Sequence, residues 1–147
     1  MRVRCISNDV MKLPKAYIRP LGVYSGGPNE INLTIGAIYT VYALAFCNGG
    51  VYFYVCDDFL ANEPGNFPSN HGAPLFEVID RTLSKYWCYD YDNNPYVEGI
   101  SGDTAFIKPS DWVNDETLYG RLVDGDPSAE AAWLKLKNLI DEEVGEI

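Results

Sequence analysis

The segment from Leu33 to Asp58, LTIGAIYTVYALAFCNGGVYFYVCDD, limits the fold more than any other part of the chain. It holds two runs rich in β-branched and aromatic residues, separated by a single Asn-Gly-Gly break. Because Asn and Gly tolerate a positive φ, this tripeptide predicts a tight β-hairpin turn. We therefore expect one strand over residues 38–47 and a returning strand over residues 51–56.

The two faces of the returning strand differ in chemistry. Side chains alternate across a strand, so Val51, Phe53 and Val55 share one face, and Tyr52 and Tyr54 share the other. We expect the first face to belong to the core. A buried tyrosine hydroxyl needs a partner or water, so the tyrosine face is either covered by the C-terminal helix or available to a partner.

Asp57 and Asp58 follow the returning strand. Aspartate commonly ends a strand, and this is the first role that we expect for the pair. The same two acids, with Tyr52 and Tyr54, form a second and weaker candidate surface for a basic partner. A divalent-metal site on the pair is a minor alternative, and we predict neither a metal nor a cofactor.

The four cysteines, Cys5, Cys47, Cys56 and Cys88, contain no CxxC pair. The pattern therefore does not indicate a zinc ribbon or a thioredoxin-type site. In the predicted hairpin, Cys47 and Cys56 lie several residues apart along the ladder, which is beyond disulfide reach. We expect reduced, mostly buried thiols.

The rest of the chain predicts short extended segments that lead into helices. We expect these extended segments at residues 2–7, 16–18, 74–80, 83–91 and 105–108. Residues 8–32 and 59–73 are predicted loops because they are rich in Pro, Gly and Asn. A connection as long as 8–32 is unusual in a small domain and indicates a binding loop, or a loop held over one end of the domain.

The character of the sequence changes near residue 109. We expect a short helix over about 115–123 with Asn114 as its N-cap, and a longer helix over about 127–143 capped by Asp126. The longer helix has an apolar stripe that should pack on the β domain. Its members recur at helical spacing: Ala129, Trp133, Leu136 and Ile140.

The net charge of -10 over 147 residues is unevenly distributed. Residues 1–91 hold seven Lys/Arg and eight Asp/Glu, whereas residues 92–147 hold four and thirteen. We expect the surplus carboxylates to face outward, where they repel nucleic acid and attract a basic macromolecule. The plain alternative is that they only keep the protein soluble.

The sequence contains no recognisable catalytic motif. His71 is the only histidine, and it lies in a Pro- and Asn-rich segment, where we expect a simple loop residue. There is no nucleophile elbow, no GxxxxGK[ST] and no GxGxxG. We therefore expect a protein that is not an enzyme.

Rings and acids mix in one segment near the middle of the chain. Tyrosine and tryptophan are favoured at the centres of interfaces, and carboxylates pair with Lys or Arg of a partner. This segment is our leading prediction for a partner-binding surface; the alternative is that the rings are core and the acids a solvated turn. Its residues are Trp87, Tyr89, Asp90, Tyr91 and Asp92.

Two motifs carry a resemblance in fold. One enters the hairpin and the other closes the domain: Leu33, Thr34, Gly36, Tyr39 and Val41, then Leu75, Phe76, Glu77 and Val78. In these motifs the chain resembles the SH3-like small barrels of many bacterial and phage proteins. The resemblance implies a mainly β (α+β) fold, with an SH3-like β-barrel over residues 1–108. Residues 109–147 would then form a helical appendage with two helices, packed on the barrel within a single domain.

In size, acidity and architecture the whole chain also resembles immunity proteins encoded beside bacterial toxins. That resemblance implies a non-enzymatic protein that covers the basic site of a toxin domain. The alternatives are a phage- or mobile-element-encoded inhibitor of a host protein, a small nucleic-acid-binding barrel, and a hydrolase. The N-terminal MRVRCISNDV is charged and no apolar segment follows it, so we expect no secretory signal, no membrane and a cytoplasmic location.

Overall fold

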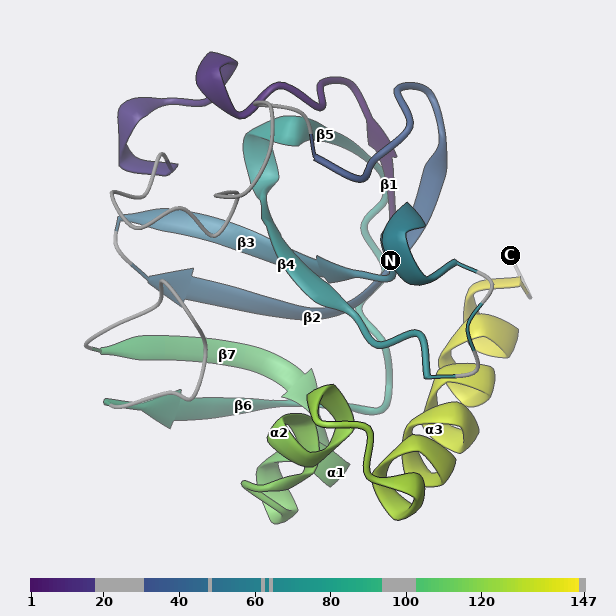
Figure 1. Ribbon diagram of the computed structural model, residues 1–147. Helices are drawn as coiled ribbons and strands as arrows, with labels where there is room; N and C mark the ends of the chain where they lie inside the picture. The colour runs from purple at the N-terminus through teal and green to yellow at the C-terminus, as the bar shows by residue number, and fades with distance from the viewer. Residues whose placement is uncertain (18–30, 48, 62, 64, 94–102, 146–147) are drawn as a thin grey trace.

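The computed structural model describes residues 1–17, 31–47, 49–61, 63, 65–93 and 103–145. Seven strands occur in these residues (Figure 1): β1 (Arg2–Cys5), β2 (Ile38–Cys47), β3 (Gly50–Val55), β4 (Ser69–Gly72), β5 (Phe76–Asp80), β6 (Trp87–Asp92) and β7 (Thr104–Pro109). The helices are α1 (Ser110–Asn114), α2 (Leu118–Val123) and α3 (Pro127–Gly145). Four single 3-10 turns are η1 (Val10–Lys12), η2 (Lys15–Tyr17), η3 (Asp58–Leu60) and η4 (Ala73–Leu75).

All strand pairs are antiparallel, which confirms the mainly β (α+β) class. The order is β4–β3–β2–β1–β5, with β7 also beside β2 and β6 beside β7. In the described residues the edge strands β4, β5 and β6 do not pair with one another, so the sheet is not closed and the predicted SH3-like β-barrel is wrong in this respect. Instead, β7 and then β6 extend the sheet from the C-terminal part of β2.

The long strand β2 joins the two parts of the sheet. Residues 38–40 pair with β1, and residues 44–46 pair with β7. On its other side β2 pairs with β3, and the register shifts between Val41 and Ala43, so Tyr42 is an extra residue. Such a bulge bends a strand and increases its twist. β1 and β7 therefore follow one another along β2.

Each face of the β2–β3 hairpin belongs to its own core cluster. Leu44 and Phe53 lie in the cluster formed with β1, η1 and η4. Tyr52 and Tyr54 lie in the cluster formed with the three helices and are only 1% and 3% exposed. The tyrosine face of β3 is therefore buried against the helices rather than available to a partner.

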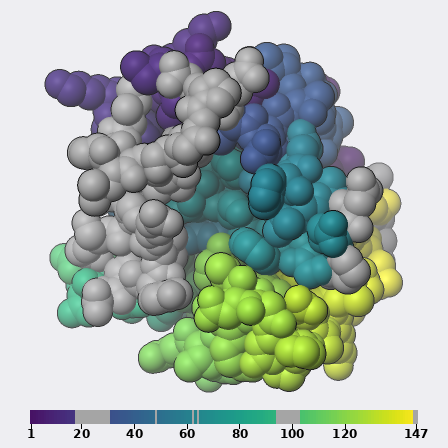
Figure 2. Space-filling view, viewed as in Figure 1, coloured from purple at the N-terminus to yellow at the C-terminus, as the bar shows by residue number. Residues whose placement is uncertain are grey.

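The helix α3 packs through the predicted stripe. Ala129, Trp133, Leu136 and Ile140 are all buried, and Asp126 caps the helix by accepting a hydrogen bond from the Ser128 N–H at 2.8 Å. Figure 2 shows α2 and α3, in lime and yellow, against the teal segment that follows β3. No helix in the described part of the chain is both long enough and apolar enough to cross a membrane.

The expected helix over 115–123 begins later than predicted, at Leu118. A separate helix, α1, ends at Asn114, and Asp115 follows it as the C-cap. The Asp115 carboxylate accepts hydrogen bonds from the N–H and hydroxyl of Thr117, which holds a turn between α1 and α2. Asn114 is therefore not an N-cap, and residues 109–145 form three helices rather than two.

Two predicted loops also contain regular structure. The segment 59–73 includes β4, whose Ser-Asn-His-Gly sequence has no strand propensity and forms only because it pairs with β3. The expected extended piece at 16–18 is replaced by η2 at Lys15–Tyr17. Of the predicted binding loop over 8–32, residues 18–30 lie outside the described residues.

The hairpin register confirms the prediction for the cysteines. Cys47 lies opposite Gly50, and Val55, next to Cys56, lies opposite Val41, so the two sulfurs sit at opposite ends of the hairpin. None of the four cysteines, all of which are described, forms a disulfide. Burial raises the pKa of Cys56 to about 12, which keeps this thiol protonated near neutral pH.

The packing of α3 predicts a large loss of stability in Trp133→Ala. The Trp133 ring meets Tyr42 and Trp112 with centroids 5.1 and 5.8 Å apart, and its Nε1 donates to the Asn66 carbonyl at 2.7 Å. We expect urea denaturation to show a decrease of about 3–5 kcal/mol in the free energy of unfolding. Leu134→Ala, on the exposed side of α3, should stay within about 0.5 kcal/mol of the parent. Similar values for the two variants would contradict this packing.

Candidate partner-binding surface

The predicted mixture of rings and acids in β6 is divided between the two faces of the sheet. Strand alternation places Tyr89 and Tyr91 on one face and Asp90 and Asp92 on the other. Tyr89 and Tyr91 are 65% and 54% exposed. The prediction of one mixed surface is therefore wrong, although the two tyrosines are available at the surface.

The two tyrosines continue an apolar face that crosses three strands. The registers align Tyr89 with Ile107 of β7, and Tyr91 with Ala105 of β7 and Phe46 of β2. Phe46 is 41% exposed, and Ala105 and Ile107 are partly exposed. We call these five residues the aromatic face.

The aromatic face is open because the neighbouring core ends before it. The core cluster of β1 and β5 buries Leu44 and Phe53, which lie on the same face of the sheet. β1 pairs only with residues 38–40 of β2, so it does not extend over Phe46. In Figure 1 the C-terminal end of β6 and the N-terminal end of β7 also extend past the helices. The rings are thus presented on a rigid sheet.

One tyrosine of the aromatic face has a fixed hydroxyl. Tyr91 donates a hydrogen bond to Asp103 with an oxygen–oxygen distance of 2.7 Å. This hydrogen bond raises the pKa of Tyr91, so the phenol stays protonated at neutral pH. The bond also holds the ring in one orientation, which reduces the entropy that a partner must overcome on binding.

The opposite face of β6 is partly neutralised. Asp90 forms an ion pair with Lys108 of β7 at 3.0 Å, and the Lys108 ammonium also lies 4.4 Å from the centre of the Phe106 ring. Asp92 also has an interaction within the protein. The Asp90 carboxylate is therefore held near the sheet rather than fully solvated, and Asp92 is partly exposed.

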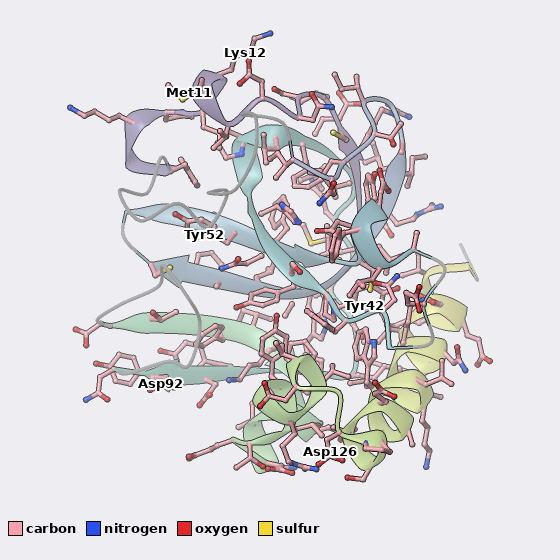
Figure 3. All side chains as sticks on the ribbon, viewed as in Figure 1. Met11, Lys12, Tyr42, Tyr52, Asp92 and Asp126 are labelled. Carbon is pink, nitrogen blue, oxygen red and sulfur yellow. The ribbon has the colours of Figure 1, made fainter. Side chains whose placement is uncertain are left out.

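Three further residues predicted to bind a partner are buried or half-buried. Trp87 packs against the core cluster of β1 and is partly covered. Tyr52 contacts the Tyr17 ring, with centroids 5.3 Å apart, and Tyr54 lies edge-on to Trp112 at 6.2 Å. The labelled Tyr52 and Tyr42 in Figure 3 lie along the sheet, Tyr42 beside α3. Tyr52 and Tyr54 cannot reach a partner in this fold, which corrects the prediction.

Asp57 and Asp58 join the end of β3 to other segments. Asp58 accepts hydrogen bonds from the Thr34 hydroxyl at 2.7 Å and the Tyr39 hydroxyl at 2.9 Å. Asp57 lies 3.1 Å from Nε2 of His71, which is a buried residue of β4 rather than the predicted loop residue. Both acids end the strand as expected. Their carboxylates have partners within the fold, Asp58 at an exposed position, so we assign the pair a structural role first.

No metal centre is formed by the described residues, where no group of three or more His, Cys, Asp or Glu side chains is placed to hold an ion.

The acidic surplus of the C-terminal third does not gather into one outward patch. Arg121 pairs with both Asp115 and Asp126, at 2.8 and 3.4 Å. Asp141 accepts from Lys137 and from the Tyr42 hydroxyl, each at 2.6 Å. In Figure 3 the labelled Asp92 and Asp126 lie far apart. In this third, the exposed acids that form no ion pair in the described chain are Asp103, Asp111, Glu116, Asp124 and Glu142.

Sequence reasoning missed Phe46, Ala105 and Ile107 as surface residues. They lie in strands that are rich in core residues, and only the pairing of β7 with β2 shows which of them align with the tyrosines of β6. The alternation of side chains along a strand assigns residues to its two faces. It does not show how much of either face is covered by other segments.

Comparison of the chain with protein-family models, with curated proteins and with solved structures gave no match.

The contacts of Asp58 predict that Asp58→Ala destabilises the fold. The substitution leaves the buried Tyr39 hydroxyl without its acceptor, so we expect thermal or urea denaturation to show a loss of about 1–3 kcal/mol. Glu116→Ala removes an exposed carboxylate that forms no ion pair in the described chain, and it should change stability by less than about 0.5 kcal/mol. Unchanged stability in Asp58→Ala would return this carboxylate to the candidate binding residues.

Proposed function

We propose that this protein acts by binding another protein through the aromatic face, and that it is an immunity protein that neutralises a basic toxin domain without catalysing a reaction. The observation that carries the proposal is the exposure of Phe46, Tyr89 and Tyr91 on one rigid sheet surface. Soluble monomers rarely leave a contiguous apolar patch uncovered unless it has a binding role.

The chemistry of these rings suits a protein interface. Aromatic side chains bury a large area with few rotatable bonds, and tyrosine adds a polar tip. Ala105 and Ile107 lie between the rings of β6 and β2, so a partner would meet a continuous apolar centre. Such a centre is where most of the binding energy of an interface is concentrated.

Charge supports a basic partner through its long-range field rather than through one contact patch. The chain carries a net charge of -10, and the exposed Asp111, Glu116, Asp124 and Glu142 form no ion pair within the described chain. A field of this sign accelerates the approach of a cationic protein and slows that of nucleic acid. Stacking of single-stranded nucleic acid on the tyrosines would also need a positive groove.

The use of the titratable groups in the middle of the chain supports a role by occupancy rather than by catalysis. His71, the only histidine, is buried against Asp57, and Asp58 accepts hydrogen bonds from the hydroxyls of Thr34 and Tyr39. An inhibitor of a host protein, encoded by a phage or mobile element, would use the same aromatic face, and the two roles differ only in the partner.

The double variant Tyr89→Ser/Tyr91→Ser tests the proposal. Loss of two interface rings should weaken partner binding at least about a hundredfold, because central tyrosines contribute about 2 kcal/mol or more each. The readout is growth of bacteria that co-express this protein with a candidate toxin domain taken from a neighbouring gene. The parent should rescue growth, and the double variant should not.

Phe59→Ser is the matched control, because Phe59 is an exposed ring outside the aromatic face. It should rescue growth as the parent does, and all three proteins should have the same melting temperature within a few degrees. Rescue by the double variant would contradict a role of the aromatic face. Failure of the parent to rescue, with a gel shift on single-stranded oligonucleotides, would replace the immunity role by nucleic-acid binding.

A further inference from the structure

We propose that the partner contributes an extended strand with alternating basic and apolar residues, which adds to the free edge of β6. This inference rests on the proposed function and specifies how the same surface is recognised. Four observations support it: the direction of the β6 backbone groups, the condition of the other edges, the side-chain alternation of β6, and its charge.

The backbone of β6 has unused hydrogen-bonding groups on its outer side. Opposite residues of an antiparallel pair alternate between bonded and non-bonded positions. The Ser110 N–H donates to the Tyr86 carbonyl, and Pro109 opposite Trp87 has no N–H, so the even-numbered residues of β6 bond with β7. The N–H and C=O groups of Tyr89 and Tyr91 therefore point away from β7, and β6 pairs with no other strand among the described residues.

The two other edges of the sheet are less suited to strand addition. β4 has only four residues, and three of them, Asn70, His71 and Gly72, are buried. β5 has an irregular register with β1 near Arg2 and Val3, and bulges of this kind protect an edge from pairing. β6 has six residues in uninterrupted register with β7, so it is the longest regular edge.

The side chains of β6 specify what an added strand must carry. An added strand continues the two faces of the sheet, so alternate residues would lie beside the tyrosine rings and beside the carboxylates. Apolar residues fit next to Tyr89 and Tyr91. Basic residues fit next to Asp90 and Asp92. The Asp90 carboxylate, which already accepts from Lys108 on the β7 side, has further acceptor positions.

A second copy of this chain fits the edge less well. In a two-fold antiparallel pair centred on Asp90, the two Asp90 side chains lie opposite each other, and in a pair centred on Tyr91, Asp90 lies opposite Asp92. Like charges directly opposite each other are destabilising. Each copy also carries a net charge of -10, which opposes association at low ionic strength. A basic strand removes both penalties.

Synthetic peptides test the proposal on the full-length protein. The probe is a capped seven-residue peptide of alternating Lys and Val, and its affinity is measured by chemical-shift titration at low ionic strength. One control has the same composition with Lys and Val in separate blocks. A second has the alternating sequence with N-methyl groups on the peptide bonds that would face β6.

We expect the alternating peptide to bind at least about tenfold more tightly than either control, which corresponds to one or two backbone hydrogen bonds. The largest shifts should fall on residues 89–92. Tyr91→Pro removes an outward N–H without removing a bond to β7, and it should weaken the alternating peptide by a similar factor. Equal binding of the block peptide would reduce the effect to general charge attraction, and equal binding of the N-methyl peptide would exclude strand addition.

The peptide and growth-rescue experiments fail separately. If the peptides do not distinguish strand addition while Tyr89→Ser/Tyr91→Ser still abolishes growth rescue, the inference is wrong and the proposed function stands. If the alternating peptide binds as expected while that double variant still rescues growth, the edge binds strands but the proposed function is wrong.

Discussion

The structure depends on the strand β2 and its bulge at Tyr42. Without the extra residue, strict alternation would place Val41 and Ala43 on one face of β2, and Tyr42 and Leu44 on the other. With it, Tyr42 and Ala43 both contribute to the core under the helices, while Val41 and Leu44 contribute to the core under β1 and β5. The hydroxyl of Tyr42 then reaches Asp141 on α3, which links the bulge directly to the C-terminal helix.

Because different parts of β2 belong to different core clusters, the aromatic face is left uncovered. The layer of β1 and β5 covers the first part of β2, and the helices cover the opposite face. Phe46 and the parts of β7 and β6 aligned with it therefore lie beyond the first layer. The rings of Tyr89 and Tyr91 remain exposed on strands that are otherwise well paired. A binding function gives a physical reason for this exposure, because a purely structural strand would carry polar residues there.

Much of the fold was predictable, because local signals agreed with tertiary packing in the hairpin and in α3. The Asn-Gly-Gly turn and the two apolar runs predict β2 within its observed bounds, and Asp126 with the Trp133 stripe predicts α3. β4 and the separation of α1 from α2 were not predictable, because pairing with β3 and the turn at Asp115 depend on tertiary contacts. The candidate site was predicted only in part. Composition selects the tyrosines of β6, but the burial of Tyr52 and Tyr54 and the pairing of the acidic residues depend on which segments pack together.

Native-state hydrogen exchange of the amides in β6 tests the central claim most directly, because it reports which backbone groups lack a partner in the free protein. If β6 is an open edge, the amides of Cys88 and Asp90 should be protected by β7, while those of Tyr89 and Tyr91 should exchange at least about a hundredfold faster. Equal protection of all four amides would show that another segment already occupies the edge, and would contradict the account of β6 as a free binding strand.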